Sequence, residues 1–76
     1  MNEEMTNTEY LQKLAEKIKN TRKQKKMTQE KLADRLGTVP SYVARMEKGE
    51  QDSRITSLLE LADALDISIG ELVSVN

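Results

Sequence analysis

The side chains best suited to specific chemistry in this sequence are hydrogen-bond donors within one short stretch, residues 39–48 (VPSYVARMEK). If the stretch is a helix whose apolar residues point inward, Ser41 and Arg45 are four positions apart and share its outer face. An arginine on such a face can donate two hydrogen bonds to guanine, and a serine can bond a base edge or a phosphate. Pro40, next to Ser41, offers apolar surface suited to a thymine methyl group. Base contacts by Pro40, Ser41 and Arg45 are therefore expected, with an ordinary solvated charge as the alternative for Arg45.

A second set of donors precedes this stretch, where residues 28–37 (TQEKLADRLG) predict another short helix. The N–H groups and the positive dipole at the start of such a helix favour an anion, and Thr28 and Gln29 add side-chain donors there. Further donors near the same edge are Lys25, Lys26, Tyr42 and Lys48. We expect all of these residues to contact DNA phosphates, which would position the protein without choosing a sequence. Two alternatives stay open: Thr28 could be only a helix cap, and Tyr42 could be half-buried against the first helix.

These donors must be positioned by two helices that cross closely at Gly37. Counting Gln29 as the first position, small or apolar residues occupy positions 4, 5, 8, 9, 15 and 18, namely Leu32, Ala33, Leu36, Gly37, Val43 and Met46. This is the packing pattern of a helix-turn-helix, whose second helix lies in the major groove of DNA. Ala33 is expected where the helices meet, and Gly37 is expected to take a positive φ. The motif covers about residues 28–48.

The sequence before this motif predicts a first helix over about residues 8–25. Apolar side chains recur there at helical spacing, namely Leu11, Leu14, Ala15 and Ile18. Its start could be capped by Thr8, or by a capping box of Thr6 and Glu9. Residues 1–7 are expected to form a flexible N-terminal segment.

The second helix of the motif should run over about residues 39–48. Pro40 is tolerated in its first turn, and Gly49 is expected to end it. Because Val39 occupies a position where a capping side chain is common, Thr38 is an alternative cap.

After a polar loop, two more apolar stretches predict a fourth and a fifth helix. The fourth covers about residues 54–65 and should bury its apolar side chains, namely Ile55, Leu58, Leu59, Ala62 and Leu65. Ser68 and Glu71 make a second capping box, which opens a short fifth helix containing Ile69, Leu72 and Val73. No strand-type alternation is visible in the sequence. The expected fold class is therefore all-α, with five helices in one compact domain over residues 8–76.

Length and composition restrict what kind of protein this is. At 76 residues the chain forms one domain at most, with a modest core. The sequence has no Cys and no His, so neither a disulfide nor a zinc site built from those residues is expected. It also lacks a glycine-rich phosphate loop and clustered carboxylates. We therefore expect that the protein is not an enzyme and that it has no catalytic residue, metal or cofactor. The acidic start and the lack of a long apolar run favour a cytoplasmic protein without a membrane span.

Charge is distributed unevenly along the chain, although the net charge is only −1. Residues 1–12 carry three acids and no base, residues 13–49 carry eleven bases and four acids, and residues 50–76 carry six acids and one base. The positive middle coincides with the expected helix-turn-helix, and attraction to phosphate depends on the local field rather than on the total charge. A solvated helix face is the alternative explanation for the basic run.

Together these motifs resemble the Cro/repressor-type helix-turn-helix family of transcriptional regulators, also called the xenobiotic-response-element family. The similarity runs from about residue 18 to residue 73, through IKNTRKQKKMTQEKLADRLG, SYVARMEKG and LLELADALDISIGELV. The resemblance implies a five-helix, lambda-repressor-like domain that binds operator DNA as a dimer, usually to repress transcription. It also implies a structural ion pair between Arg22 and Glu47, and it matches the phosphate-binding glutamine of the family to Gln29.

We therefore expect a sequence-specific repressor that binds a palindromic operator in double-stranded DNA, as a homodimer, through the major groove. The dimer surface is expected on helices four and five and the apolar tail, because one small module buries too little surface for tight specific binding. An antitoxin or adaptor that acts mainly through a protein partner is the alternative, in line with the acidic flanks.

Overall fold

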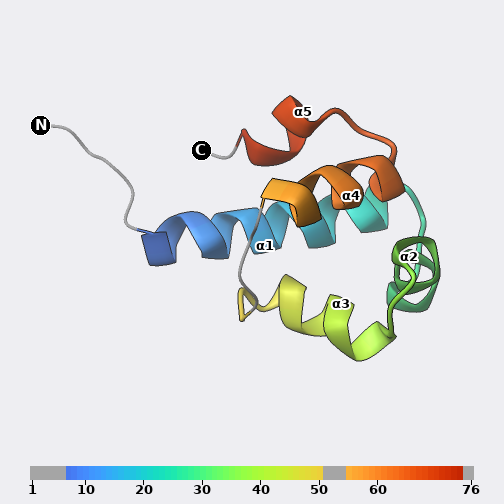
Figure 1. Cartoon of the computed structure of the whole chain (residues 1–76). Coiled ribbons are helices and arrows are strands. Elements are labelled where there is room, and N and C mark those ends of the chain that lie inside the picture. The colour runs from blue at the N-terminus through green and yellow to red at the C-terminus, as the bar shows by residue number, and fades with distance from the viewer. Residues whose placement is uncertain (1–6, 51–54, 75–76) are drawn as a thin grey trace, which may run out of the picture.

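Five α-helices and no strand make up the part of the chain that the computed structural model describes, residues 7–50 and 55–74, of which residues 55 and 56 are described by backbone alone. The helices are α1 (Asn7–Gln24), α2 (Gln29–Leu36), α3 (Pro40–Glu47), α4 (Ile55–Leu65) and α5 (Ile69–Val73). In Figure 1, α4 and α5 lie on one side of the long α1, α3 lies on the other, and α2 stands near the C-terminal end of α1. The expected all-α fold with five helices is confirmed.

The hydrophobic core forms where all five helices meet. Each helix contributes one large, fully buried side chain, namely Leu14, Leu32, Val43, Leu65 and Leu72. The helix α1 packs against α3 and α5, α2 packs against α3 and α4, and α4 packs against α5. Because α2 rests on α4 while α3 rests on α1, the crossing of α2 and α3 is held from both sides.

Four helices end in the same backbone motif, a left-handed residue that reverses the chain. The four residues have φ between 59° and 77° and are Lys26 after α1, Gly37 after α2, Gly49 after α3 and Asp66 after α4. In each motif the left-handed residue donates its N–H to the carbonyl three residues back, and the next residue donates to the carbonyl five residues back, over 2.9–3.2 Å. These bonds satisfy carbonyls that the end of a helix leaves unpaired. Glycine favours this conformation, so the two glycines were predictable helix ends, whereas Lys26 and Asp66 were not.

The starts of α3 and α5 show one wrong and one correct expectation. The helix α3 begins at Pro40, and its N-cap is Val39, whose side chain makes no capping hydrogen bond. The expected alternative cap, Thr38, is wrong because Thr38 belongs to the turn that ends α2. At α5, Ser68 is the N-cap and its Oγ accepts from the N–H of Glu71 at 3.0 Å, which is one half of the expected capping box.

The start of α1 lies one residue earlier than expected. Asn7 is its first residue, so Thr8 lies inside the helix rather than at a cap. Thr6 and the rest of the expected flexible segment, residues 1–6, lie outside the described residues. The expected start of the fourth helix, Arg54, lies outside them as well.

One residue of α4 that was expected in the core is exposed. Leu59 is 49% exposed, whereas Leu61, which was not expected there, is 2% exposed. Leu58, Leu61, Ala62 and Leu65 are buried at the spacing i, i+3, i+4, i+7, and Ala64 is buried beside this stripe. Leu59 falls outside this stripe because each residue turns the helix by about 100°. The side chain of Ile55, which was expected in the core as well, lies outside the described residues.

Candidate nucleic-acid interface

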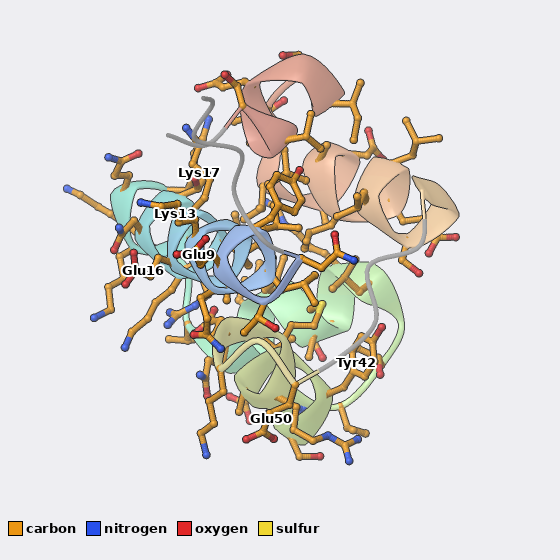
Figure 2. The ribbon with its side chains drawn as sticks, turned by 90° about the vertical axis from the view of Figure 1, so that its left-hand side faces the viewer. Glu9, Lys13, Glu16, Lys17, Tyr42 and Glu50 are labelled. Carbon is orange, nitrogen blue, oxygen red and sulfur yellow. The ribbon has the colours of Figure 1, made fainter. Side chains whose placement is uncertain are left out.

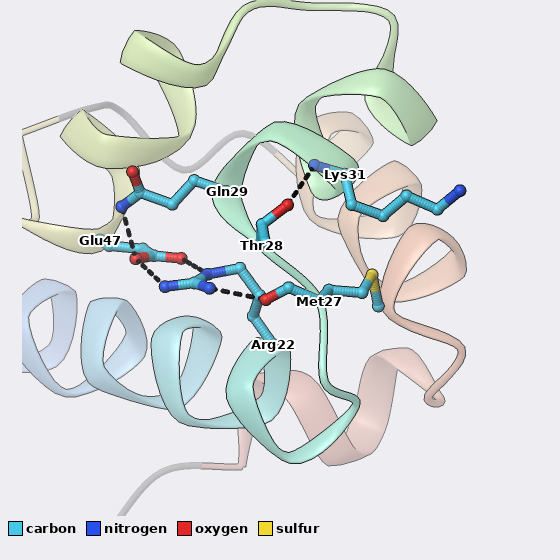
Figure 3. Close-up of polar contacts among 6 residues, drawn as sticks. All are labelled: Arg22, Met27, Thr28, Gln29, Lys31 and Glu47. Carbon is cyan, nitrogen blue, oxygen red and sulfur yellow. Dashed lines mark hydrogen bonds and ion pairs between the residues drawn. The ribbon is translucent and has the colours of Figure 1, made fainter.

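A capping residue begins α2, a glycine ends it, and a small residue lies where α2 meets α3. Thr28 is the N-cap of α2, and its Oγ1 accepts a hydrogen bond from the N–H of Lys31 at 3.0 Å (Figure 3). Where the two helices meet, Ala33 and Val43 are both 0% exposed, so a larger side chain at position 33 would push the helices apart. Gly37 ends α2 in the left-handed region, at φ 70°. The structure therefore contains the helix-turn-helix that the sequence spacing predicts.

Behind the turn, a buried ion pair joins α1 to α3. Arg22 donates from Nε to Oε2 of Glu47 at 2.6 Å and from Nη2 to Oε1 at 3.1 Å, and the two side chains are 9% and 3% exposed. Its Nη1 donates to the main-chain carbonyl of Met27 at 2.7 Å, in the loop before α2. This is the pair that the resemblance implies. It ties together the end of α1, the loop that follows it and the end of α3.

Gln29, the first residue of α2, bonds the same carboxylate. Its Nε2 donates to Oε1 of Glu47 at 3.1 Å, the oxygen that also accepts from Arg22 (Figure 3). The side chain of Gln29 is half-buried. The sequence indicated Gln29 only as a phosphate donor, so this contact was missed. We call Arg22, Gln29 and Glu47 the Glu47 cluster.

The outer face of α3 carries the residues expected to contact bases. Pro40, Ser41 and Arg45 are exposed, whereas Val43 on the opposite side is fully buried. Lys48, which follows the helix, is exposed as well. These side chains are therefore accessible to a large ligand, and they offer hydrogen-bond donors together with apolar surface.

Tyr42 is half-buried, and no residue of α1 lines the small cavity beside it. It lines a small cavity of about 60 Å³ together with Leu36, Thr38, Met46, Ser57, Glu60 and Leu61. Figure 2 shows Tyr42 well away from the labelled side chains of α1. The half-buried alternative is thus what the structure shows, with a different partner from the one expected. A phosphate contact by the Tyr42 hydroxyl stays a prediction.

The two lysines of the loop between α1 and α2 have different surroundings. Lys25 donates from Nζ to the main-chain carbonyl of Asp66 at 3.2 Å, in the turn after α4. Lys26 is exposed and takes the left-handed conformation that ends α1. A phosphate contact by Lys25 would require its ammonium group to share that carbonyl or to leave it. For both lysines the contact stays a prediction.

Three long-range hydrogen bonds that hold the helices together could not be read from the sequence. They join Tyr10 Oη to the carbonyl of Val73 at 3.2 Å, Arg35 Nη1 to that of Ala64 at 3.1 Å, and Gln12 Nε2 to that of Lys48 at 3.3 Å. Each links a side chain to the backbone of a distant segment. Hydrophobic periodicity and capping patterns carry no signal for such pairs.

No helix among the described residues has both the length and the apolar character needed to cross a membrane. The same residues include no group of three or more His, Cys, Asp or Glu side chains that could hold a metal ion. Figure 2 looks along α1 and shows Glu9, Lys13, Glu16 and Lys17 on one side of the helix.

Comparison with known proteins identifies a matching family and two similar proteins. A model of the family described as "Helix-turn-helix" matches residues 18–72. The chain is 40% identical over 60 residues to YqaE of Bacillus subtilis, named an uncharacterized HTH-type transcriptional regulator, and 38% identical over 60 residues to RstR of Vibrio cholerae, named a cryptic phage CTXphi transcriptional repressor. These matches cover 78% and 79% of this chain, but 51% and 54% of the relatives. The chain thus spans about half the length of these two relatives.

A solved structure shows the same helix arrangement. The restriction-modification controller protein C.AhdI from Aeromonas hydrophila matches with a TM-score of 0.77 and 37% sequence identity. The match covers 82% of this chain and 90% of that chain. The likeness therefore includes the helices that pack on the helix-turn-helix as well as the motif itself.

Proposed function

The chain belongs to the helix-turn-helix family of transcriptional regulators, and on this basis we propose that it is a repressor that binds a palindromic operator in double-stranded DNA as a homodimer, through the major groove. In this proposal α3 is the recognition helix, and Pro40, Ser41 and Arg45 contact base edges. The phosphate contacts come from Lys25, Lys26, Thr28, Gln29, Tyr42 and Lys48. The two curated relatives are named a transcriptional regulator and a transcriptional repressor. Binding to an operator would take place in the cytoplasm.

The observation that carries the proposal is the outer face of α3. Ser41 and Arg45 are exposed on the side opposite the buried Val43, so the helix can enter a groove without uncovering the core. The major groove is about 12 Å wide, which admits an α-helix with its side chains. The one acid within α3, Glu47, is paired with Arg22, so its charge is offset where phosphates would approach.

A second copy of the chain is part of the proposal because one module of this size buries too little DNA for tight specific binding. The helices α4 and α5 offer a surface for it, since Leu59 is 49% exposed and Ile69 and Val73 are half-buried. The apolar tail residue Val75 lies outside the described residues. With two-fold symmetry the half-sites would lie about 10–10.5 base pairs apart, one turn of the double helix.

Selection of bound sequences from random double-stranded DNA tests the proposal. An enriched palindrome with half-sites about one helical turn apart supports operator binding and the two-fold dimer together. An enriched sequence without symmetry would overturn the dimer while keeping sequence-specific binding. No enrichment by a protein that circular dichroism shows to be folded would overturn operator binding.

An antitoxin or adaptor that acts mainly through a protein partner is the second candidate. It is favoured by the acidic charge of residues 50–76, which carry six acids and one base. Reversal of charge in the double variant Arg45→Glu, Lys48→Glu separates the two candidates. If the protein is a DNA-binding repressor, this variant should keep its helical content and lose duplex binding. A weak duplex affinity that the double variant leaves unchanged favours the second candidate.

A further inference from the structure

We propose that Glu47 is a positioning residue, which orients the side-chain amide of Gln29 so that one of its N–H groups can face a DNA phosphate. This inference rests on the proposed function, because it needs the phosphate contact of Gln29. Its starting point is the 3.1 Å hydrogen bond from Gln29 Nε2 to Glu47 Oε1. The ion pair with Arg22 already compensates the charge of Glu47. The main effect of the additional bond is therefore to orient the side-chain amide of Gln29.

The chemistry of a carboxylate determines which end of the Gln29 amide faces inward. Ionised Glu47 can only accept hydrogen bonds, so it must meet the NH₂ group and not the carbonyl oxygen of Gln29. Figure 3 shows the amide nitrogen directed at Glu47 and the amide oxygen directed away from it. An NH₂ group has two N–H donors, and Glu47 takes one of them. The other remains for an external acceptor such as a phosphate oxygen.

Glu47 can hold Gln29 in place because Glu47 is itself buried and held by hydrogen bonds. Its side chain is 3% exposed and accepts two hydrogen bonds from Arg22, at 2.6 and 3.1 Å. Arg22 is anchored in turn on the carbonyl of Met27 at 2.7 Å. Among the described residues, every buried side-chain nitrogen and oxygen has a hydrogen-bond partner. A donor that is ordered before the ligand arrives loses less conformational freedom on binding, which favours affinity.

Charge separates this role from a purely structural one. A carboxylate repels a phosphate that binds near it, so by charge alone Glu47→Gln should tighten duplex binding by the folded protein. The positioning role predicts the opposite, that Glu47→Gln weakens duplex binding. A glutamine at position 47 has one oxygen, which the buried Arg22 would take, and its NH₂ group would then face Gln29. Two NH₂ groups cannot bond each other as donors, so the Gln29 amide would turn over, its oxygen would accept from position 47, and its NH₂ group would no longer be held where Glu47 holds it.

The test is a double-mutant cycle on duplex affinity. The wild type, Gln29→Ala, Glu47→Gln and the double variant are titrated by fluorescence anisotropy against a labelled duplex of about two helical turns, at low salt. Any sequence serves, because phosphate contacts do not depend on sequence. Glu50→Gln is the matched control, since it removes the same charge from an exposed side chain three residues further on. Circular dichroism identifies a temperature at which every variant is folded.

We expect Gln29→Ala and Glu47→Gln each to weaken binding about tenfold, and the double variant to bind no more weakly than either single variant. Glu50→Gln should bind as tightly as the wild type, or more tightly. If Gln29→Ala weakens binding while Glu47→Gln behaves like Glu50→Gln, the positioning role is wrong and the proposed function stands. If the wild type binds the duplex and Gln29→Ala changes nothing, the phosphate contact and this inference fail together. A wild type that binds no duplex overturns the proposed function as well.

A second measurement decides the matter if Glu47→Gln does not fold. In the wild type, NMR should show that the Gln29 side-chain amide proton bonded to Glu47 exchanges with water more slowly than the side-chain amide protons of Gln24, whose side chain is exposed. Addition of the same duplex should shift the Gln29 amide resonances and leave that proton protected. Exchange at Gln29 as fast as at Gln24 would show that the hydrogen bond to Glu47 is missing, and the inference would fail.

Discussion

At the residue scale, two positions hold a backbone conformation that their side chains disfavour. Lys26 and Asp66 end α1 and α4 in the left-handed region, at φ 59° and 60°, where Gly37 and Gly49 serve α2 and α3. A Cβ in this region costs roughly 1 kcal/mol relative to glycine. The two hydrogen bonds that close each motif hold the chain there despite this cost. These positions are therefore places where one substitution can stabilise the domain.

We expect Asp66→Gly to raise the free energy of unfolding by about 0.5–1 kcal/mol, because it relieves the backbone and leaves the core untouched. The main-chain carbonyl that accepts from Lys25 is retained. Urea denaturation followed by circular dichroism measures the change. Asp63→Gly, at an exposed position within α4, is the control and should lower stability by about 1 kcal/mol. A loss of stability in Asp66→Gly would contradict the prediction.

At the element scale, the attachment of α3 to α1 depends on a buried ion pair. Arg22 and Glu47 are 9% and 3% exposed, so each charge relies on the other for compensation. The Met27 carbonyl, bonded by the same arginine, adds the start of the helix-turn-helix to this attachment. The pair therefore sets where the outer face of α3 lies relative to the rest of the domain.

Removal of one partner should be costlier than removal of both. Arg22→Met should lower the free energy of unfolding by about 3–5 kcal/mol, because it leaves Glu47 charged and buried without compensation. The double variant Arg22→Met, Glu47→Met should recover most of this loss, since it leaves no buried charge. Thermal and urea unfolding of both variants measure the difference. Equal losses in the single and double variants would show that the charges are not coupled.

The exposed face of α3 should separate base readout from phosphate binding. Arg45→Ala should flatten the preference at one or two operator positions, with a loss of about 1–3 kcal/mol of discrimination. Lys48→Ala should instead weaken binding to all sequences alike. Affinities for the selected operator and its single-base variants measure both effects. The reverse pattern would exchange the roles assigned to these two residues.

At the scale of the whole molecule, the distribution of charge matters more than its sum. The net charge is −1, yet residues 13–49 carry eleven bases and four acids. If this local field drives binding, the logarithm of duplex affinity should fall linearly with the logarithm of salt concentration, with a slope of about −0.9 per phosphate neutralised. Titrations at several potassium chloride concentrations give the slope. Lys48→Gln should reduce the magnitude of the slope by about 0.9, which corresponds to one phosphate contact. An affinity that does not change with salt would contradict electrostatic binding.

The sequence by itself determined the helices and the presence of the helix-turn-helix. Thr28, Ala33 and Gly37 indicate a cap, a close crossing and a helix end through their own steric and hydrogen-bonding properties, and these act over a few residues. The exposure of Ser41 and Arg45 followed from the same local spacing. For the candidate interface, the sequence therefore identified which residues face outward on α3.

Only the tertiary structure decided the features that depend on which helices meet. Leu61 rather than Leu59 enters the core, Tyr42 lines a cavity together with residues of α2 and α4, and Gln29 bonds Glu47. The periodicity of one helix gives the width of its apolar stripe but not the direction of the neighbour that covers it. A hydrogen bond such as that from Gln29 to Glu47 joins side chains eighteen residues apart, so it depends on how α2 and α3 pack together.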